Sequence, residues 1–189
     1  MDKDLQVVIE MTERIGQGFR RDLDDVTSEE VDWRPLPQAN SINLIVRHLC
    51  IEAQWHQASL ERGEPMPSET TDDLQRQIDS VPLDFERNLK TFEDAYSSFL
   101  TALRKMTLVD LEQRSRAAYQ GRPVRSAHFL GFHQAMHVSM HWGQIRTIRN
   151  MYRKTRGEPA RFFPDNPTFP KGEADNTPPQ PPSGSDAPA

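Results

Sequence analysis

The chain has 189 residues, a formal net charge of −5 and a sequence pI of about 5.7, which fit one acidic domain with a core of its own. A nucleic-acid or anionic-membrane partner is disfavoured because phosphate neutralisation needs a net basic face, and no apolar run approaches the roughly 20 residues that a bilayer requires. The single cysteine, Cys50, excludes an internal disulfide, and no apolar leader is visible at the N-terminus, so we expect a soluble cytoplasmic protein.

Four long segments carry a helical period, and no segment convincingly indicates a strand. The first predicted helix covers about residues 3–26. A linker is expected over residues 28–40, because its two prolines cannot continue a helix. The second predicted helix begins after an N-cap at Asn40 or Ser41 and ends at Gly63.

The second half of the chain predicts two more long helices. A connector reaches Pro82, and residues 70–80 within it are expected to form a short helix. The third long helix is predicted over about residues 83–106, with Pro82 well placed to open it. A second long connector leads to the fourth, which is predicted to begin near Ser126 and to end around residues 154–156, where basic side chains suit the helix dipole.

The composition changes after Gly157. Residues 157–170 carry three phenylalanines and are expected to pack on the bundle as an extended aromatic arm. Residues 171–189 contain no large apolar side chain, so we expect a disordered tail. The predicted fold is therefore all-α, with a four-helix bundle over residues 1–156 whose long connections allow consecutive helices to run parallel as well as antiparallel.

Three histidines, His133, His137 and His141, recur at four-residue spacing in the fourth predicted helix. Residues four apart on a helix are stacked neighbours, so two such imidazoles can bind one metal ion. At 100° per residue, His133 and His141 lie about 40° to either side of His137, on the apolar stripe of the helix. These histidines are therefore expected to face the bundle interior, whereas His128 falls near 180° and should be exposed or at an edge.

The second predicted helix has a matching face, on which Glu52 and Trp55 lie within about 60° of His48 among apolar residues. His48 can thus point toward the same interior as His137 and His141. Three nitrogens from two helices leave open coordination positions for water or substrate, which is typical of a catalytic metal site rather than a closed structural one. We expect His48, His137 and His141 to bind one divalent ion.

Four residues near this site are candidates for supporting roles. His133 is a third ligand of the fourth helix, a catalytic base or a core residue. Glu52 is expected to orient an imidazole, with a role as proton acceptor as the alternative. Trp55 and Gln144 are expected to line the substrate pocket.

Two further groups of residues are not expected to take part in catalysis or metal binding. Cys50 is about 200° from His48 on the helix, so it should be a small buried residue and neither ligand nor nucleophile. Arg146, Arg149 and Arg153 are expected on a solvated face, with a clamp for an anionic substrate as the alternative.

These motifs resemble those of the DinB/YfiT superfamily. The resemblance covers about residues 3–155 and rests on Trp33-x-Pro35, on the run over residues 40–49, and on His137-x3-His141-Trp142-Gly143-Gln144-Ile145. It implies an up-down-down-up four-helix bundle. It also implies a divalent metal such as nickel or zinc, bound by one histidine of the second helix and two of the fourth, here His48, His137 and His141.

Relatives with assigned activity include thiol-dependent S-transferases that use mycothiol or bacillithiol, a maleylpyruvate isomerase and metal hydrolases. The resemblance therefore implies a metal-dependent transferase or hydrolase acting on a small molecule, with a low-molecular-weight thiol or water as nucleophile. The alternative is a non-catalytic metal- or ligand-binding module of a stress response. A ligand-sized cavity beside the metal would favour the enzyme.

The first and third predicted helices carry apolar residues at spacings that give a broad stripe, such as Phe85, Leu89, Phe92, Phe99 and Leu103 of the third. One bundle core is not expected to cover the whole stripe, and the relatives are often homodimers. We therefore expect a symmetric homodimer that buries on the order of 1,200–2,000 Å² in total.

Overall fold

The computed structural model describes residues 2–67, 71–119 and 129–160. These ranges contain seven α-helices and no strand, which confirms the all-α prediction. None of these helices is long and apolar enough to cross a membrane. The helices are α1 (Lys3–Arg21), α2 (Ser28–Asp32), α3 (Ile42–Arg62), α4 (Thr71–Ser80), α5 (Phe85–Leu103), α6 (Leu108–Ala118) and α7 (Phe129–Thr155).

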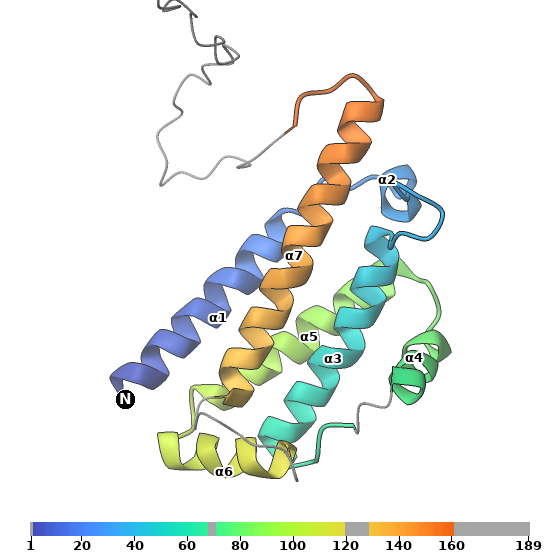
Figure 1. Cartoon of the computed structure of the whole chain (residues 1–189). Coiled ribbons are helices and arrows are strands. Elements are labelled where there is room, and N and C mark those ends of the chain that lie inside the picture. Colours follow the sequence, from blue (N-terminus) through green and yellow to red (C-terminus); the bar gives the residue numbers. More distant parts are fainter. Residues whose placement is uncertain (1, 68–70, 120–128, 161–189) are drawn as a thin grey trace, which may run out of the picture.

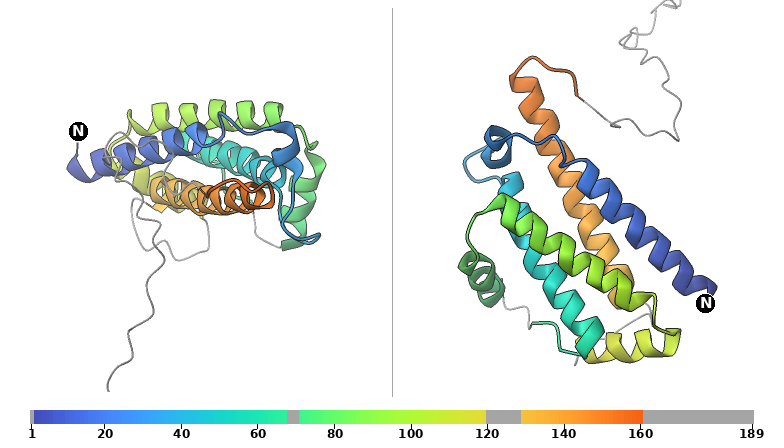
Figure 2. Two further views of the ribbon diagram at one scale, coloured as in Figure 1. Left: turned by 90° about the horizontal axis from the view of Figure 1, so that it is seen from above. Right: turned by 180° about the vertical axis from the view of Figure 1, so that it is seen from behind.

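The four long helices, α1, α3, α5 and α7, form the bundle (Figure 1). The chain ascends in α1, descends in both α3 and α5, and ascends again in α7, so the up-down-down-up order is confirmed (Figures 1 and 2). The parallel pair α3 and α5 packs most extensively, and α7 lies against both α1 and α3. The connection that contains α4 returns the chain to the starting end of α3 and so makes the parallel pair.

Helix α3, which carries the first candidate ligand, begins and ends where its sequence predicts. The Ser41 side chain accepts a hydrogen bond from the backbone N–H of Leu44, which satisfies one of the free donors of the first turn. At the other end, Gly63 caps the helix with φ of 72°, a left-handed conformation that glycine adopts without a steric penalty.

Two short helices occupy segments that were predicted as connectors. The first predicted helix ends at Arg21 instead of continuing to Val26, and α2 forms within the expected linker because Thr27 caps it. Helix α6 forms after α5, where Thr107 and Asp110 make a reciprocal capping box. The short helix predicted before Pro82 is present as α4.

The predicted boundaries of the other long helices shift by a few residues. Asp84, and not Pro82, opens α5, because the aspartate side chain accepts from the backbone N–H of Arg87. Helix α7 is described from Phe129 onward. His128, the predicted start of α7 at Ser126, the phenylalanines of the predicted arm and the predicted tail lie outside the described residues.

The stripe on α5 from which the dimer was argued is covered within one chain. Leu89, Phe92, Phe99 and Leu103 are all buried, because α3 packs along this face and α1 covers part of it. This reason for expecting a dimer is therefore wrong. Of the exposed large apolar side chains of the bundle helices, Val7 lies on α1 and four lie on α7, at Phe132, Met136, Met140 and Met151.

Candidate metal centre

The structure brings together three histidines from α3 and α7. Nε2 of His137 lies 3.1 Å from Nε2 of His48 and 3.0 Å from Nε2 of His141. One ring nitrogen from each residue falls within a group no wider than 4.8 Å, so a single ion could contact all three. Among the residues that the structure describes, this is the group with metal-ligand spacing.

Helix packing produces this convergence. His137 and His141 are one turn apart on α7, and their rings stand 4.6 Å from centroid to centroid. Val138 and Ile145 of α7 are fully buried in the same core cluster as most of the buried apolar residues of α3, so the two helices are held face to face. His48 therefore meets the α7 pair across the interface between the helices.

Burial keeps all three imidazoles in their neutral form. Desolvation, together with the neighbouring His141, lowers the pKa of His48 to about 4. Desolvation and the surrounding histidines lower the pKa of His137 to about 2, and desolvation also lowers the pKa of His141. Neutral imidazole is the form that binds metal, so these residues are ready to act as ligands near pH 7.

Gln144 sets the tautomer of His141. Its Oε1 lies 2.8 Å from His141 Nδ1, and because an amide oxygen only accepts hydrogen bonds, Nδ1 must carry the proton. Nε2 of His141 therefore presents a lone pair to the other two histidines. A ligating histidine usually donates its second nitrogen to such an oxygen, so Gln144 prepares His141 to bind an ion.

The three converging Nε2 atoms do not satisfy one another as hydrogen-bonding groups. A single proton on His137 Nε2 has to serve both neighbours, and Nδ1 of His137 is buried with no partner among the described residues. A divalent cation accepts all three lone pairs at once and leaves Nδ1 of His137 as the protonated nitrogen. The donor set therefore fits a metal better than it fits a hydrogen-bond network.

A second cluster lies beside the triad. Nδ1 of His133 lies 3.0 Å from Nε2 of His56 and 2.8 Å from the Tyr119 hydroxyl, and the ring of His133 stacks on that of His137 at 5.9 Å and 19°. His56 is fully buried and its Nδ1 donates to the carbonyl of Glu52 at 2.7 Å. His133 is thus not one of the three converging residues but adjoins them.

The predicted supporting residues fall into different surroundings. Glu52 is buried on α3, with its carboxylate 3.8 Å from Nδ1 of His56. Trp55 is partly buried and packs against the main core cluster. Gln144 contacts His141 directly and also lines a surface groove, so it has a second role besides the one predicted.

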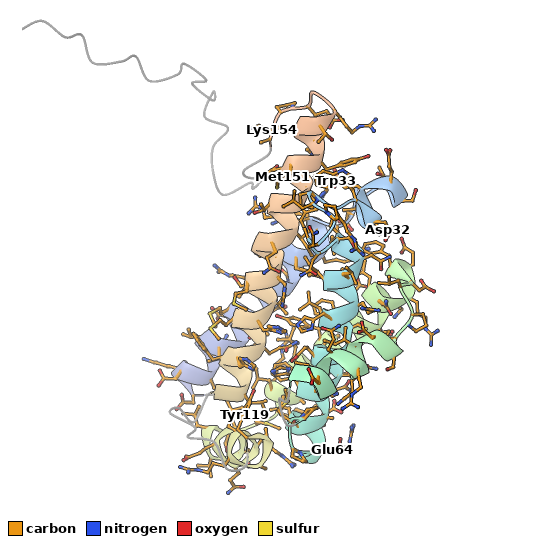
Figure 3. The ribbon with its side chains drawn as sticks, turned by 45° about the vertical axis from the view of Figure 1, so that its right-hand side comes forward. Asp32, Trp33, Glu64, Tyr119, Met151 and Lys154 are labelled. Carbon is orange, nitrogen blue, oxygen red and sulfur yellow. The ribbon has the colours of Figure 1, made fainter. Side chains whose placement is uncertain are left out.

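Sequence reasoning missed His56 and Tyr119. His56 follows His48 by eight residues, which places it about 80° around α3 and off the stripe that carries His48. His56 could have been identified only by noting that it would face His133 across the α3–α7 interface. Tyr119 lies at the end of α6, a helix that was not predicted, near the start of α7 (Figure 3).

Cys50 is a buried structural residue, as expected. Its Sγ donates to the carbonyl of Arg47 at 3.2 Å, and burial raises the pKa of its thiol to about 11. A thiol in this state is not a nucleophile near pH 7.

Arg146 and Arg153 are only 26% and 11% exposed and pair with Asp22 and Asp25, so a solvated arginine face is not what forms. The expectation is most clearly wrong for Arg149. Its guanidinium is buried and pairs with Glu30 at 2.7 Å and with Asp25 at 2.8 Å, and it donates to the carbonyl of Asp22. The side chain of Asp22 accepts in turn from Nε1 of Trp142 at 2.6 Å. These contacts join α1 and α2 to the part of α7 that follows His141 and therefore help to hold α7 in place next to the three histidines.

The fold and the triad define an all-α bundle whose open three-histidine site can hold one divalent ion. The chain belongs to the DinB superfamily, whose family model matches residues 11–145. The matched range begins within α1 and ends in α7, so it includes all three histidines. No curated protein and no solved structure matches the chain significantly.

Proposed function

We propose that the protein is a metal-dependent enzyme in which His48, His137 and His141 hold a divalent ion, such as nickel or zinc, that activates a thiol or a water molecule. The convergence of three neutral Nε2 atoms carries this proposal. Three protein ligands leave coordination positions for a nucleophile or substrate, whereas structural zinc sites close all four. The bound ion would supply a lowered pKa for the coordinated thiol or water near neutral pH.

His133 is the proton acceptor that we propose for this chemistry. Because His56 Nδ1 donates to the Glu52 carbonyl, Nε2 of neutral His56 has no proton and accepts from Nδ1 of His133. In this scheme the Tyr119 hydroxyl oxygen, 2.8 Å from the same Nδ1, is a second acceptor of that N–H. His133 then keeps a basic lone pair on Nε2. His56 is a positioning residue in this scheme, and Glu52, predicted as an alternative base, acts by holding His56.

The first test is metal analysis of the purified protein together with a thiol-conjugation screen. The screen compares mycothiol, bacillithiol and water as nucleophiles with the metal-loaded protein and its chelated form. His137→Ala should lose both the metal and the activity. Ser139→Ala, an exposed position on the same helix, is the matched control and should retain both.

The outcomes of this test are distinct. One ion per chain with turnover that depends on it supports the enzyme, and the preferred nucleophile separates transferase from hydrolase. One ion per chain without turnover in any arm would instead support the non-catalytic module. A protein that does not bind nickel or zinc, with the Ser139 control intact, would contradict the assignment of the triad as ligands.

A further inference from the structure

A surface groove of about 480 Å³ runs along α7. Its walls are the second half of α7 and the segment that leads into α3. None of the described residues that line it is charged, and most are apolar. They are Pro35, Ala39, Asn40, Ile45, Met140, Gly143, Gln144, Thr147, Ile148 and Met151.

The groove adjoins the candidate metal centre through three of its residues. Gln144 lines it and accepts the hydrogen bond from His141 Nδ1. Met140 directly precedes His141, and Ile45 lies one turn before His48 on α3. Met151 lines the groove near the C-terminal end of α7 (Figure 3). A molecule bound along α7 would therefore have one end beside the triad.

Gly143 indicates that this space is kept open. Glycine inside a helix costs roughly 0.5–1 kcal/mol relative to alanine. Three other helical glycines have a packing reason, because a Cβ would press on Tyr96 at Gly16, on Trp142 at Gly18 and on Val8 at Gly131. At Gly143 no atom of the described chain lies within 4 Å of an added Cβ.

We propose that this groove binds the uncharged, apolar part of a small-molecule substrate and directs its reactive end to the metal centre, which makes the inference rest on the proposed function. Methionine side chains suit such a role because they adapt to apolar ligands of varied shape. Met140 and Met151 are 56% and 44% exposed, so both are available to a ligand. A carboxylate or ammonium group would find no opposite charge in the groove.

Benzyl alcohol is the test probe, and benzylammonium is the charged probe with the same ring. Each is titrated into the full-length, zinc-loaded protein labelled with ¹³C on the methionine methyl groups. The resonances of Met140 and Met151, assigned by single Met→Leu substitutions, should shift and saturate with benzyl alcohol. Benzylammonium should bind at least tenfold more weakly, because its charge would lose solvation without gaining a partner.

Gly143→Leu extends a side chain into the groove from a position where an added Cβ has open space, and it should weaken benzyl alcohol binding at least tenfold. Ser139→Leu adds the same side chain to an exposed position of α7 outside the groove and should leave binding unchanged. Zinc content is measured for each variant. Gly143→Leu should keep its ion, so that loss of probe binding is separate from failure of the metal site.

Three results would overturn the inference. The first is no saturable shift of either methionine in the parent protein. The second is equal binding by the parent and Gly143→Leu. The third is a change from dimer to monomer in light scattering of Gly143→Leu alone, which would show that a second copy of the chain covers the groove.

Discussion

Gln144 is expected to control how tightly the triad holds its ion. Gln144→Leu keeps the size of the side chain but removes the oxygen that fixes the tautomer of His141. Loss of such a partner typically lowers metal affinity by about 10–100-fold. Competition with a coloured chelator measures this change directly.

Thr147→Ala is the control for Gln144→Leu, because Thr147 lines the same groove and its hydroxyl donates to the backbone carbonyl of Gly143 rather than to a histidine. The affinity of the Thr147→Ala protein for the ion should match that of the parent protein. Equal affinity in Gln144→Leu and Thr147→Ala would show that the tautomer of His141 does not depend on Gln144.

His56 is expected to make the protein less stable in mild acid. Burial lowers its folded-state pKa from 6.5 to about 3, and this effect outweighs the hydrogen bond from Nδ1 to the Glu52 carbonyl. Below pH 6.5 the unfolded chain therefore binds a proton that the folded chain does not, so stability falls as the pH falls. Between pH 7 and pH 5 the protonation of this residue in the unfolded chain should lower the free energy of unfolding by about 2 kcal/mol.

His56→Gln isolates this contribution, since the other histidines of the cluster titrate in both proteins. Denaturant unfolding at pH 7, 6 and 5 should give a shallower pH dependence for the variant, by roughly 1 kcal/mol per pH unit in the acid part of the range. The variant should also be less stable at pH 7 because it loses buried contacts. Parallel pH profiles would contradict the neutral, buried state assigned to His56.

At the scale of single residues, the convergence of the three histidines was predictable from sequence, whereas the residues around them were not. Four-residue spacing places His137 and His141 on one face regardless of tertiary structure, and His48 follows from the apolar face of its own helix. The contacts of His133 with His56 and Tyr119 depend on how α3, α6 and α7 meet. No periodicity within a single helix contains that information.

At the scale of the helices, Gly18 and Gly143 predict opposite effects of the same substitution. A Cβ on Gly18 would overlap the ring of Trp142, whose Nε1 is bonded to Asp22 and cannot easily shift. Gly18→Ala should therefore cost about 1–3 kcal/mol despite its better helix propensity. The added Cβ of Gly143→Ala has open space around it, so this substitution should raise the free energy of unfolding by roughly 0.5–1 kcal/mol.

Urea unfolding of the two variants measures this contrast, and each serves as the other's control for helix propensity. A destabilised Gly143→Ala would mean that an unseen group packs on this position. A neutral Gly18→Ala would mean that α1 and α7 can separate slightly without loss of stability. The contrast cannot be obtained from sequence, because both glycines sit in equally helical patterns.

The long helices were predictable from periodicity and caps, whereas α2 and α6 were missed for an identifiable reason. Helix α2 has only 5 residues, too few for an apolar period, and α6 buries a single large apolar side chain, Leu111, so its period is weak. Their capping residues, Thr27 and Thr107, carry the signal that was available, since each is followed three residues later by an acidic side chain. Arg149 was misplaced because its partners belong to α2 and to the turn after α1.

At the scale of the whole molecule, we propose that the protein is a homodimer that uses the first half of α7. Phe132 and Met136 are 47% and 44% exposed one turn apart, an apolar surface that a second copy could cover. Phe132→Ser with Met136→Ser should reduce the mass in light scattering from dimer to monomer at micromolar concentration. A parent protein that is already monomeric under these conditions would refute the proposal.

The bundle is expected to stay folded without its ion. Two clusters of buried apolar side chains, one around Phe19 and Phe92 and one around Phe99 and Leu103, account for most of the core. A metal in an open site adds only the linkage free energy, about 2.7 kcal/mol when the free ion exceeds its dissociation constant 100-fold. Chelation and His137→Ala should therefore lower the melting temperature while leaving the helicity at room temperature unchanged.

Circular dichroism melts with and without chelator test this expectation, and zinc added after the chelator is removed should restore the melting temperature of the parent but not of His137→Ala. Chelation should not lower the melting temperature of His137→Ala any further, because the variant holds no ion for the chelator to remove. A protein whose folding free energy comes from the metal behaves differently and unfolds when the ion is taken away. Loss of helicity at room temperature on chelation would therefore assign the three histidines to a structural site, and the proposed catalytic role of the ion would fail with it.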